Sequence, residues 1–148
     1  MIRRVLIANR GEVAVRIIRA CRELGIETVL VYSDADAHSL AVSMADQAIY
    51  IGAAPAAESY LRKDKILEAA TQTNCDAVHP GFGFLSENAE FASLVQAAGL
   101  IFIGPDPAAD TMRLRQKALE PARQLGIPTV PNITAKIKTA VQSSFPCY

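Results

Sequence analysis

Three signals are missing from the 148-residue sequence: paired cysteines, a surplus of charge of either sign, and an apolar run long enough to cross a bilayer. Cys21, Cys75 and Cys147 share no Cys-x-x-Cys spacing, so the sequence supports neither a zinc site nor a redox motif. The formal net charge is zero, which gives no electrostatic reason to expect a nucleic-acid or anionic-membrane partner. No signal peptide precedes the first apolar segment, and we expect a cytoplasmic protein.

Charge is nevertheless distributed unevenly along the chain. Residues 1–25 hold six arginines and two glutamates, whereas residues 26–111 hold three basic and twelve acidic residues. Residues 112–148 are basic again, with six basic residues and one acidic residue. This distribution favours self-association or contact with a neighbouring domain over a groove that binds a polyanion.

The periodicity of the apolar residues predicts an α/β domain. Short apolar runs typical of buried parallel strands occur five times, at residues 5–8, 28–32, 48–51, 77–79 and 100–103. Helical patterns alternate with these runs over short connections, so right-handed crossovers should build an open parallel sheet. We therefore expect about five strands with flanking helices, in a Rossmann-like arrangement.

The first predicted helix lies between the first two strands and ends at Gly25. Its expected apolar stripe consists of Val13, Ile17, Cys21 and Leu24. Arg16, Arg19 and Glu23 lie off this stripe, at positions i, i+3 and i+7, and form a charged face. Such a face is usually solvated, but its mixed signs also suit a contact between two copies of the chain.

Capping residues predict the boundaries of the later helices. A short helix is expected over residues 39–44, and Asp64 and Ser86 are the expected N-caps of two longer helices. Asp106-Pro107 opens a further helix, with the two residues in the preferred order. Pro121 should interrupt that helix, because proline removes a backbone donor and clashes with the preceding turn.

The turn from Asn9 to Glu12 is the first candidate site. It follows a buried strand and opens a helix, which is how α/β proteins place backbone N–H groups and a helix N-terminus near an anionic ligand. Gly11 allows a close approach of backbone to ligand, and Arg10 supplies a positive charge or points into solvent. The turn has a single glycine and no Gly-x-Gly-x-x-Gly, so a nicotinamide dehydrogenase is disfavoured.

Two further segments end predicted strands and should share this site. They are His79 to Asn88, which contains Gly81-Phe82-Gly83-Phe84, and Gly104-Pro105. The two glycines permit a tight turn that holds the Phe82 ring over a cleft, whereas Phe84 is expected in the core. His79 is expected to be a buried structural histidine, because no second metal-binding residue or catalytic partner lies at a suitable spacing.

The acidic residues between the second and third predicted strands form no metal-binding motif. Asp34, Asp36 and Asp46 do not have the spacing of a calcium or magnesium loop. They are therefore expected to form a solvated acidic face.

The three turn segments together resemble the N-terminal domain of biotin carboxylases, the ATP-dependent subunits of biotin-dependent acyl-CoA carboxylases. The resemblance extends from Met1 to about Pro131 and predicts a domain at 1–131, of the kind that precedes an ATP-grasp body, followed by a tail at 132–148. It implies the ligands ATP, Mg²⁺ and biotin, with a biotin carboxyl carrier and a carboxyltransferase as partners. Residues 53–61 look more like the α subunits of methylcrotonyl- or propionyl-CoA carboxylases than like free-standing biotin carboxylase.

The resemblance also implies which residues contact the reactants. These are Asn9, Arg10, Gly11, Glu12, Gly81, Phe82, Gly83 and Arg115. At two of these positions the sequence departs from the family. Phe82 replaces a tyrosine, and Arg115 stands where the family has a phosphate-binding lysine, whose compact ammonium a planar guanidinium does not reproduce.

The family's lid and ATP-grasp body follow this domain and supply most of its ligands and its catalytic base. The 148 residues contain neither, so we expect no catalytic residue in this chain, no tight binding of a cofactor and no activity alone. In the family the helix carrying Arg16, Arg19 and Glu23 lies at the homodimer contact. The alternatives are a non-catalytic dimerisation module and an unrelated nucleotide-binding α/β protein.

The last segment has two possible states. Prolines at 121, 128, 131 and 146 oppose regular structure, so order is expected to fail from about Pro121. Alternatively, Ile133, Ile137 and Val141 form one face of a short amphipathic helix that docks on the domain.

Overall fold

The computed structural model describes residues 1–104 and 123–128 of the chain. Within residues 123–128 the Gly126 N–H donates to the Arg123 carbonyl oxygen at 3.0 Å, which closes a turn. The expected helix after Asp106-Pro107, the break at Pro121, the ligand residue Arg115 and the tail at 132–148 lie outside the described residues.

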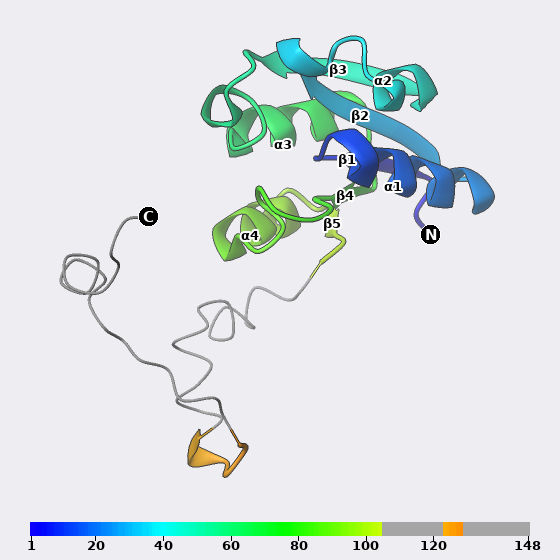
Figure 1. The fold of residues 1–148 in the computed structure, drawn as a ribbon. Coiled ribbons are helices and arrows are strands. Elements are labelled where there is room, and N and C mark those ends of the chain that lie inside the picture. The colour runs from blue at the N-terminus through cyan, green and yellow to red at the C-terminus, as the bar shows by residue number, and fades with distance from the viewer. Residues whose placement is uncertain (105–122, 129–148) are drawn as a thin grey trace, which may run out of the picture. The chain divides into compact units, whose positions relative to one another are not determined.

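Residues 1–104 contain a five-stranded parallel sheet (Figure 1). Its strands are β1 (Arg4–Ile7), β2 (Glu27–Ser33), β3 (Gln47–Gly52), β4 (Ala77–His79) and β5 (Ile101–Phe102). They pair in the order β3-β2-β1-β4-β5, and every pair is parallel. The predicted α/β fold with an open parallel sheet is confirmed.

Helices cover both faces of the sheet. They are α1 (Gly11–Glu23), α2 (Leu40–Met44), α3 (Lys63–Gln72) and α4 (Ala89–Ala97), with short 3₁₀ turns η1 (Asp34–Asp36) and η2 (Ala56–Glu58). One core cluster packs α1 and α2 on the sheet, and the other packs α3 and α4 on the opposite face (Figure 1). The connections are therefore crossovers that return each strand to the same sheet.

The strands divide their side chains between these two layers. On β1, Leu6 faces the α3/α4 cluster, whereas Val5 and Ile7 face the α1/α2 cluster. On β2, Val29 and Leu30 separate in the same way. Because successive residues of a strand point to opposite faces, a strand that is buried on both faces must be apolar throughout. This explains why the strands appear in the sequence as continuous apolar runs.

The buried stripe of α1 differs from the predicted one. The structure buries Ala14, Val15, Ile18 and Cys21, and it leaves Leu24 74% exposed. Ala14 is fully buried because its small side chain lets the helix lie close to the sheet. Leu24 is the C-cap, where the chain turns away from the core toward Gly25, whose φ of +67° suits glycine.

Two predicted helix starts were wrong. The helix expected after Ser86 begins three residues later, because Ser86 and Asn88 first donate their N–H groups to carbonyls of a turn. Asn88 is its N-cap and accepts the Phe91 N–H at 2.9 Å. The helix expected to start at Asp64 has Arg62 as its N-cap, and the Asp64 carboxylate binds the Arg62 guanidinium instead.

Candidate functional site

Asn9 joins the two main segments predicted to share a site. It follows β1 and is 3% exposed. Its side-chain amide donates to the carbonyl oxygens of Pro80 at 2.7 Å and Phe82 at 2.8 Å, and its Oδ1 accepts the Arg10 N–H at 2.9 Å. Both segments lie at the carboxyl ends of neighbouring strands, β1 and β4. From this pair the chain order runs outward in both directions, which makes it the topological switch point where open α/β sheets bind ligands.

We call this region the switch-point edge. It consists of the residues at and just after the carboxyl ends of β1, β2 and β4, namely 8–12, 33–36 and 79–85. Seven of the eight predicted ligand residues lie on it, and the eighth, Arg115, lies outside the described residues. These seven are Asn9, Arg10, Gly11, Glu12, Gly81, Phe82 and Gly83.

Glycine is required at position 81 because the backbone there approaches Asn9 closely. Gly81 has a φ of +65°, and a Cβ at this position would lie 2.7 Å from both Asn9 Nδ2 and Val13 Cγ1. Gly11 and Gly83 also have positive φ values, of +58° and +71°, but nothing lies within 4 Å of a Cβ built at either. Glycine at 81 is therefore explained by packing, whereas the space beside Gly11 and Gly83 is open.

His79 holds the same loop. Its Nδ1 accepts the Gly81 N–H at 3.0 Å, and burial lowers the pKa of the imidazole below its usual 6.5. A neutral ring is required for this acceptor role, so the low pKa and the hydrogen bond support each other. These contacts agree with a structural histidine.

A buried polar network lies beside Arg10 on the switch-point edge. Asp36 Oδ2 accepts hydrogen bonds from the Ser33 hydroxyl at 2.9 Å and the Tyr60 hydroxyl at 2.8 Å. Asp36 Oδ1 lies 3.5 Å from Arg10 Nε, and the Arg10 Cζ lies 5.9 Å from the centre of the Tyr60 ring. Burial, together with the bond to Asp36, raises the pKa of Tyr60 to about 12, so its hydroxyl stays a donor at neutral pH.

The expectation of a solvated acidic face was wrong for Asp36, whereas Asp46 is exposed as expected. Asp36 is 8% exposed within the network just described. Asp46 accepts the Thr28 N–H at 2.8 Å and the Thr28 hydroxyl at 2.7 Å, and these bonds lower the pKa of its carboxyl. The sequence does contain a signal for Asp36, since it follows the second strand and therefore lies at the same sheet edge as Asn9.

The two phenylalanines of the loop are both accessible. Phe82 is 80% exposed, and Phe84, expected in the core, is 37% exposed. Phe84 stacks on Tyr60 with ring centres 5.0 Å apart, and its φ of +42° is unusual for a non-glycine residue. The expectation of a core position failed because the tight turn directs this ring over Tyr60 instead.

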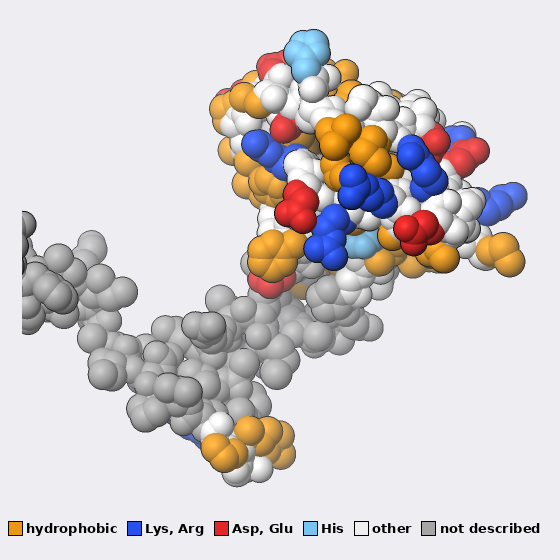
Figure 2. All heavy atoms as spheres, turned by 45° about the vertical axis from the view of Figure 1, so that its right-hand side comes forward, with side chains coloured by type: hydrophobic (Ala, Val, Ile, Leu, Met, Phe, Trp, Pro, Cys, Tyr) orange, Lys and Arg blue, Asp and Glu red, His pale blue; other side chains and the backbone are white. Residues whose placement is uncertain are grey.

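The charged face of α1 is exposed at Arg16, Arg19 and Glu23. Arg16 pairs with Glu12 one turn earlier at 3.9 Å, and both side chains are largely exposed. On the face of the molecule drawn in Figure 2, basic and acidic side chains are interspersed rather than gathered by sign. The exposed face of α1, which carries both signs of charge, therefore suits a partner that also carries both signs.

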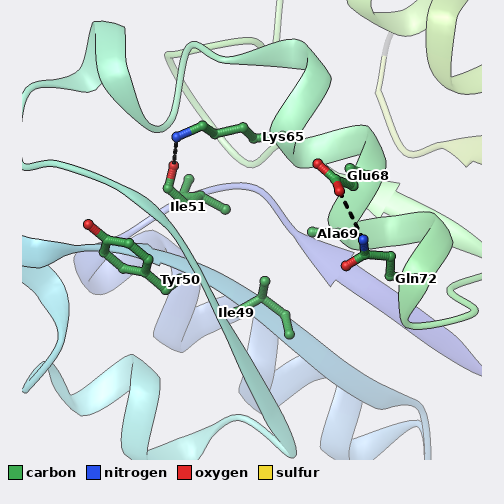
Figure 3. A pocket seen from close by; sticks show the side chains of 7 residues that line it. All are labelled: Ile49, Tyr50, Ile51, Lys65, Glu68, Ala69 and Gln72. Carbon is green, nitrogen blue, oxygen red and sulfur yellow. Dashed lines mark hydrogen bonds between the residues drawn. The ribbon is translucent and has the colours of Figure 1, made fainter.

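A separate hollow of about 250 Å³ lies between β3 and α3 (Figure 3). Lys65 reaches along it and donates to the Ile51 carbonyl oxygen at 2.8 Å, and Gln72 donates to Glu68 at 2.9 Å. Lys65 thus anchors the end of β3. None of the residues that line the hollow belongs to the switch-point edge. Among residues 1–104 and 123–128 we find no group of three or more metal-ligating side chains and no helix able to span a membrane.

Comparisons with known proteins agree with this geometry. Residues 1–109 match the family model described as the biotin carboxylase N-terminal domain. The chain is 53% identical over 132 residues to biotin carboxylase 1 of Bacillus subtilis, covering 88% of this chain and 29% of that protein. It is 49% identical over 140 residues to the mitochondrial propionyl-CoA carboxylase alpha chain of Sus scrofa, covering 93% of this chain and 19% of that one.

Solved structures show the same relationship. The biotin carboxylase domain of a single-chain bacterial carboxylase superposes with a TM-score of 0.84 at 46% identity, covering 92% of this chain and 32% of that one. The chain therefore spans less than a third of the length of each of these relatives.

Proposed function

Because the chain belongs to the biotin carboxylase N-terminal domain family, we propose that it forms one wall of a biotin carboxylase active site. The wall is the switch-point edge, and the reaction of the complete enzyme is the ATP- and bicarbonate-dependent carboxylation of biotin. The observation that carries the proposal is the double hydrogen bond from Asn9 to Pro80 and Phe82. It fixes two loops side by side where parallel sheets bind ligands, with Gly11 and Gly83 open beside them.

The residues described do not fit a complete cofactor site. Mg²⁺ requires oxygen ligands held together, and the described part of the chain holds no group of three or more His, Cys, Asp or Glu side chains placed to bind a metal ion. We therefore derive no phosphoryl-transfer step from these residues. The contribution of this wall is to position an anionic reactant through Arg10 and open backbone N–H groups, while ATP, Mg²⁺ and biotin depend mainly on other residues.

The partners follow from the same proposal. The relatives continue well beyond the matched region, so the remainder of a biotin carboxylase is the first partner. The other proposed partners are a second copy of the chain, a biotin carboxyl carrier and a carboxyltransferase. The chain is 53% identical to a biotin carboxylase and 49% identical to a propionyl-CoA carboxylase alpha chain, so it is similar to both kinds of enzyme. A cytoplasmic location belongs to the proposal and is supported by Cys21 and Cys75, which are free and buried.

The test replaces the matched N-terminal region of Bacillus subtilis biotin carboxylase 1 with this chain. We expect the purified 148-residue chain to release no ADP above a no-protein control, and the chimera to release ADP when bicarbonate and biotin are present. Asn9→Asp in the chimera removes both amide donors, and misplaced loops should lower kcat/KM by about a hundred-fold. The matched control is Asp46→Asn, because Asp46 binds Thr28 near the start of β2, away from the switch-point edge. A folded but inactive chimera, or ADP release by the chain alone, contradicts the proposal.

A second candidate function is a non-catalytic module that dimerises through α1. The exposed charged face of Arg16, Arg19 and Glu23 favours it. The two functions are compatible, since a domain can form a wall of a site and a dimer contact at once.

A further inference from the structure

The network beside Arg10 fixes the orientation of the Asp36 carboxylate. Its Oδ2 accepts from both Ser33 and Tyr60, so rotation of the carboxylate would break two buried hydrogen bonds. Its Oδ1 is left for Arg10 Nε. The carboxylate therefore faces the arginine in one defined orientation.

Tyr60 is itself held in place. Its side chain is fully buried, its ring stacks on Phe84, and its oxygen also accepts the Ser33 N–H at 3.2 Å. It lies 24 residues from Asp36 in the chain and so ties the segment before α3 to the loop after β2. Because the Tyr60 hydroxyl both donates to Asp36 and accepts from Ser33, it cannot move without losing buried contacts.

Within the part of the chain that the structure describes, Asp36 and Tyr60 hold the Arg10 side chain. Asp36 faces its Nε and Tyr60 lies near its Cζ, and the side chain is 44% exposed. Among the described residues, no hydrogen bond or ion pair involves its two terminal Nη groups. A guanidinium offers a second pair of donors through those groups, with a spacing that matches two oxygens of one anion.

We propose that Asp36 and Tyr60 are positioning residues that orient the Arg10 guanidinium, so that its terminal Nη groups meet a small oxyanion at the switch-point edge. The identity of that anion, with bicarbonate and phosphate as the two sources, rests on the proposed function. The orientation of Arg10 does not.

The test follows the Arg10 Nε–H by NMR in the 148-residue chain. Tyr60→Phe removes one oxygen atom and one of the two bonds that fix Asp36. We expect the Arg10 Nε–H to exchange with solvent about five-fold faster, the factor that corresponds to one lost buried hydrogen bond. Asp36→Asn should have a larger effect. Arg4, whose Nε donates to Glu27 at 2.7 Å, is the reference in the same spectra, and Tyr32→Phe is the control variant.

The outcomes separate the inference from the proposed function. Unchanged exchange at Arg10 in a folded Tyr60→Phe chain overturns the positioning role, and this variant decides even if Asp36→Asn fails to fold. Sodium bicarbonate and sodium phosphate are then titrated against sodium chloride at equal ionic strength. A saturable shift at Arg10 that weakens in Tyr60→Phe identifies the anion. Faster exchange in Tyr60→Phe with no shift by either anion supports positioning and contradicts the anion-binding role of the wall.

Discussion

At the scale of single residues, the switch-point edge depends on side chains that satisfy neighbouring backbone groups. Asn9 uses both donors and its acceptor on the chain itself, and His79 accepts from the loop that Asn9 also binds. Gly81 lies between them, where a Cβ would meet Asn9. Each of these residues therefore shapes the loop, and a substitution should act through loop geometry.

Gly81→Ala and Gly83→Ala form a matched pair. Both need a left-handed backbone, which costs an alanine about 1–2 kcal/mol. Only Gly81→Ala also brings a Cβ within 2.7 Å of Asn9 and Val13. We expect Gly81→Ala to lower the free energy of unfolding by roughly 1 kcal/mol more than Gly83→Ala, as for other overpacking changes. Urea denaturation measures both, and equal losses would show that the close contact relaxes freely.

His79 predicts a loss of stability as the pH falls. Its folded pKa lies below 6.5, so between 6.5 and that lower value the unfolded chain binds a proton that the folded chain does not. The melting temperature should therefore fall as the pH drops through about 6.5 and toward that lower pKa. His79→Asn keeps an acceptor for the Gly81 N–H but does not titrate, so its fall over this range should be smaller. Parallel curves for the two proteins would exclude His79 as the cause.

At the scale of helices and strands, the sequence predicted which elements exist better than it predicted where they begin and end. All five strands were found because each is a short apolar run, and burial on both faces explains this for the central strands β1, β2 and β4. The predicted starts of α3 and α4 were wrong because local turns and ion pairs decide which residue caps a helix. The pair of Arg62 with Asp64 is an example, and composition does not specify it. The α1 stripe was displaced because a buried alanine carries little apolar signal in a sequence.

The N-cap of α4 can be tested directly. Asn88→Ala removes the acceptor for the Phe91 N–H and should destabilise the domain by about 1 kcal/mol. Ser86→Ala is the control, because Ser86 engages the preceding turn through its backbone N–H. Thermal unfolding compares the two variants. A larger loss for Ser86→Ala would return the cap to the position predicted from sequence.

At the scale of the whole molecule, the sheet order explains what the sequence revealed of the site. The segments after β1 and β4 were predicted to meet because carboxyl ends of parallel strands share one edge, and Asn9 shows them in contact. The Asp36–Tyr60 bond was missed because it joins two loops through side chains, a contact that no local pattern encodes. Strand ends can be read from periodicity, whereas hydrogen bonds between distant loops require coordinates.

Self-association is the prediction at this scale. We expect a homodimer that uses the exposed α1 face, in which Arg19→Glu places like charges together and weakens association by at least about ten-fold. Glu68→Arg, on α3, reverses an exposed charge elsewhere and should leave association unchanged. Analytical ultracentrifugation measures both. A monomeric parent chain, or a dimer unaffected by Arg19→Glu, removes this face from consideration.

The central position of β1 has a consequence for synthesis on the ribosome. The strand is made first, yet one of its two neighbours is β4, and Val5 pairs with Ala77. At roughly 5–20 residues per second, β1 waits several seconds for that neighbour to be translated. Until then its apolar residues lack half of their final environment. The nascent chain is therefore most exposed to misassembly and chaperone capture while β2 and β3 are already available and β4 has not emerged.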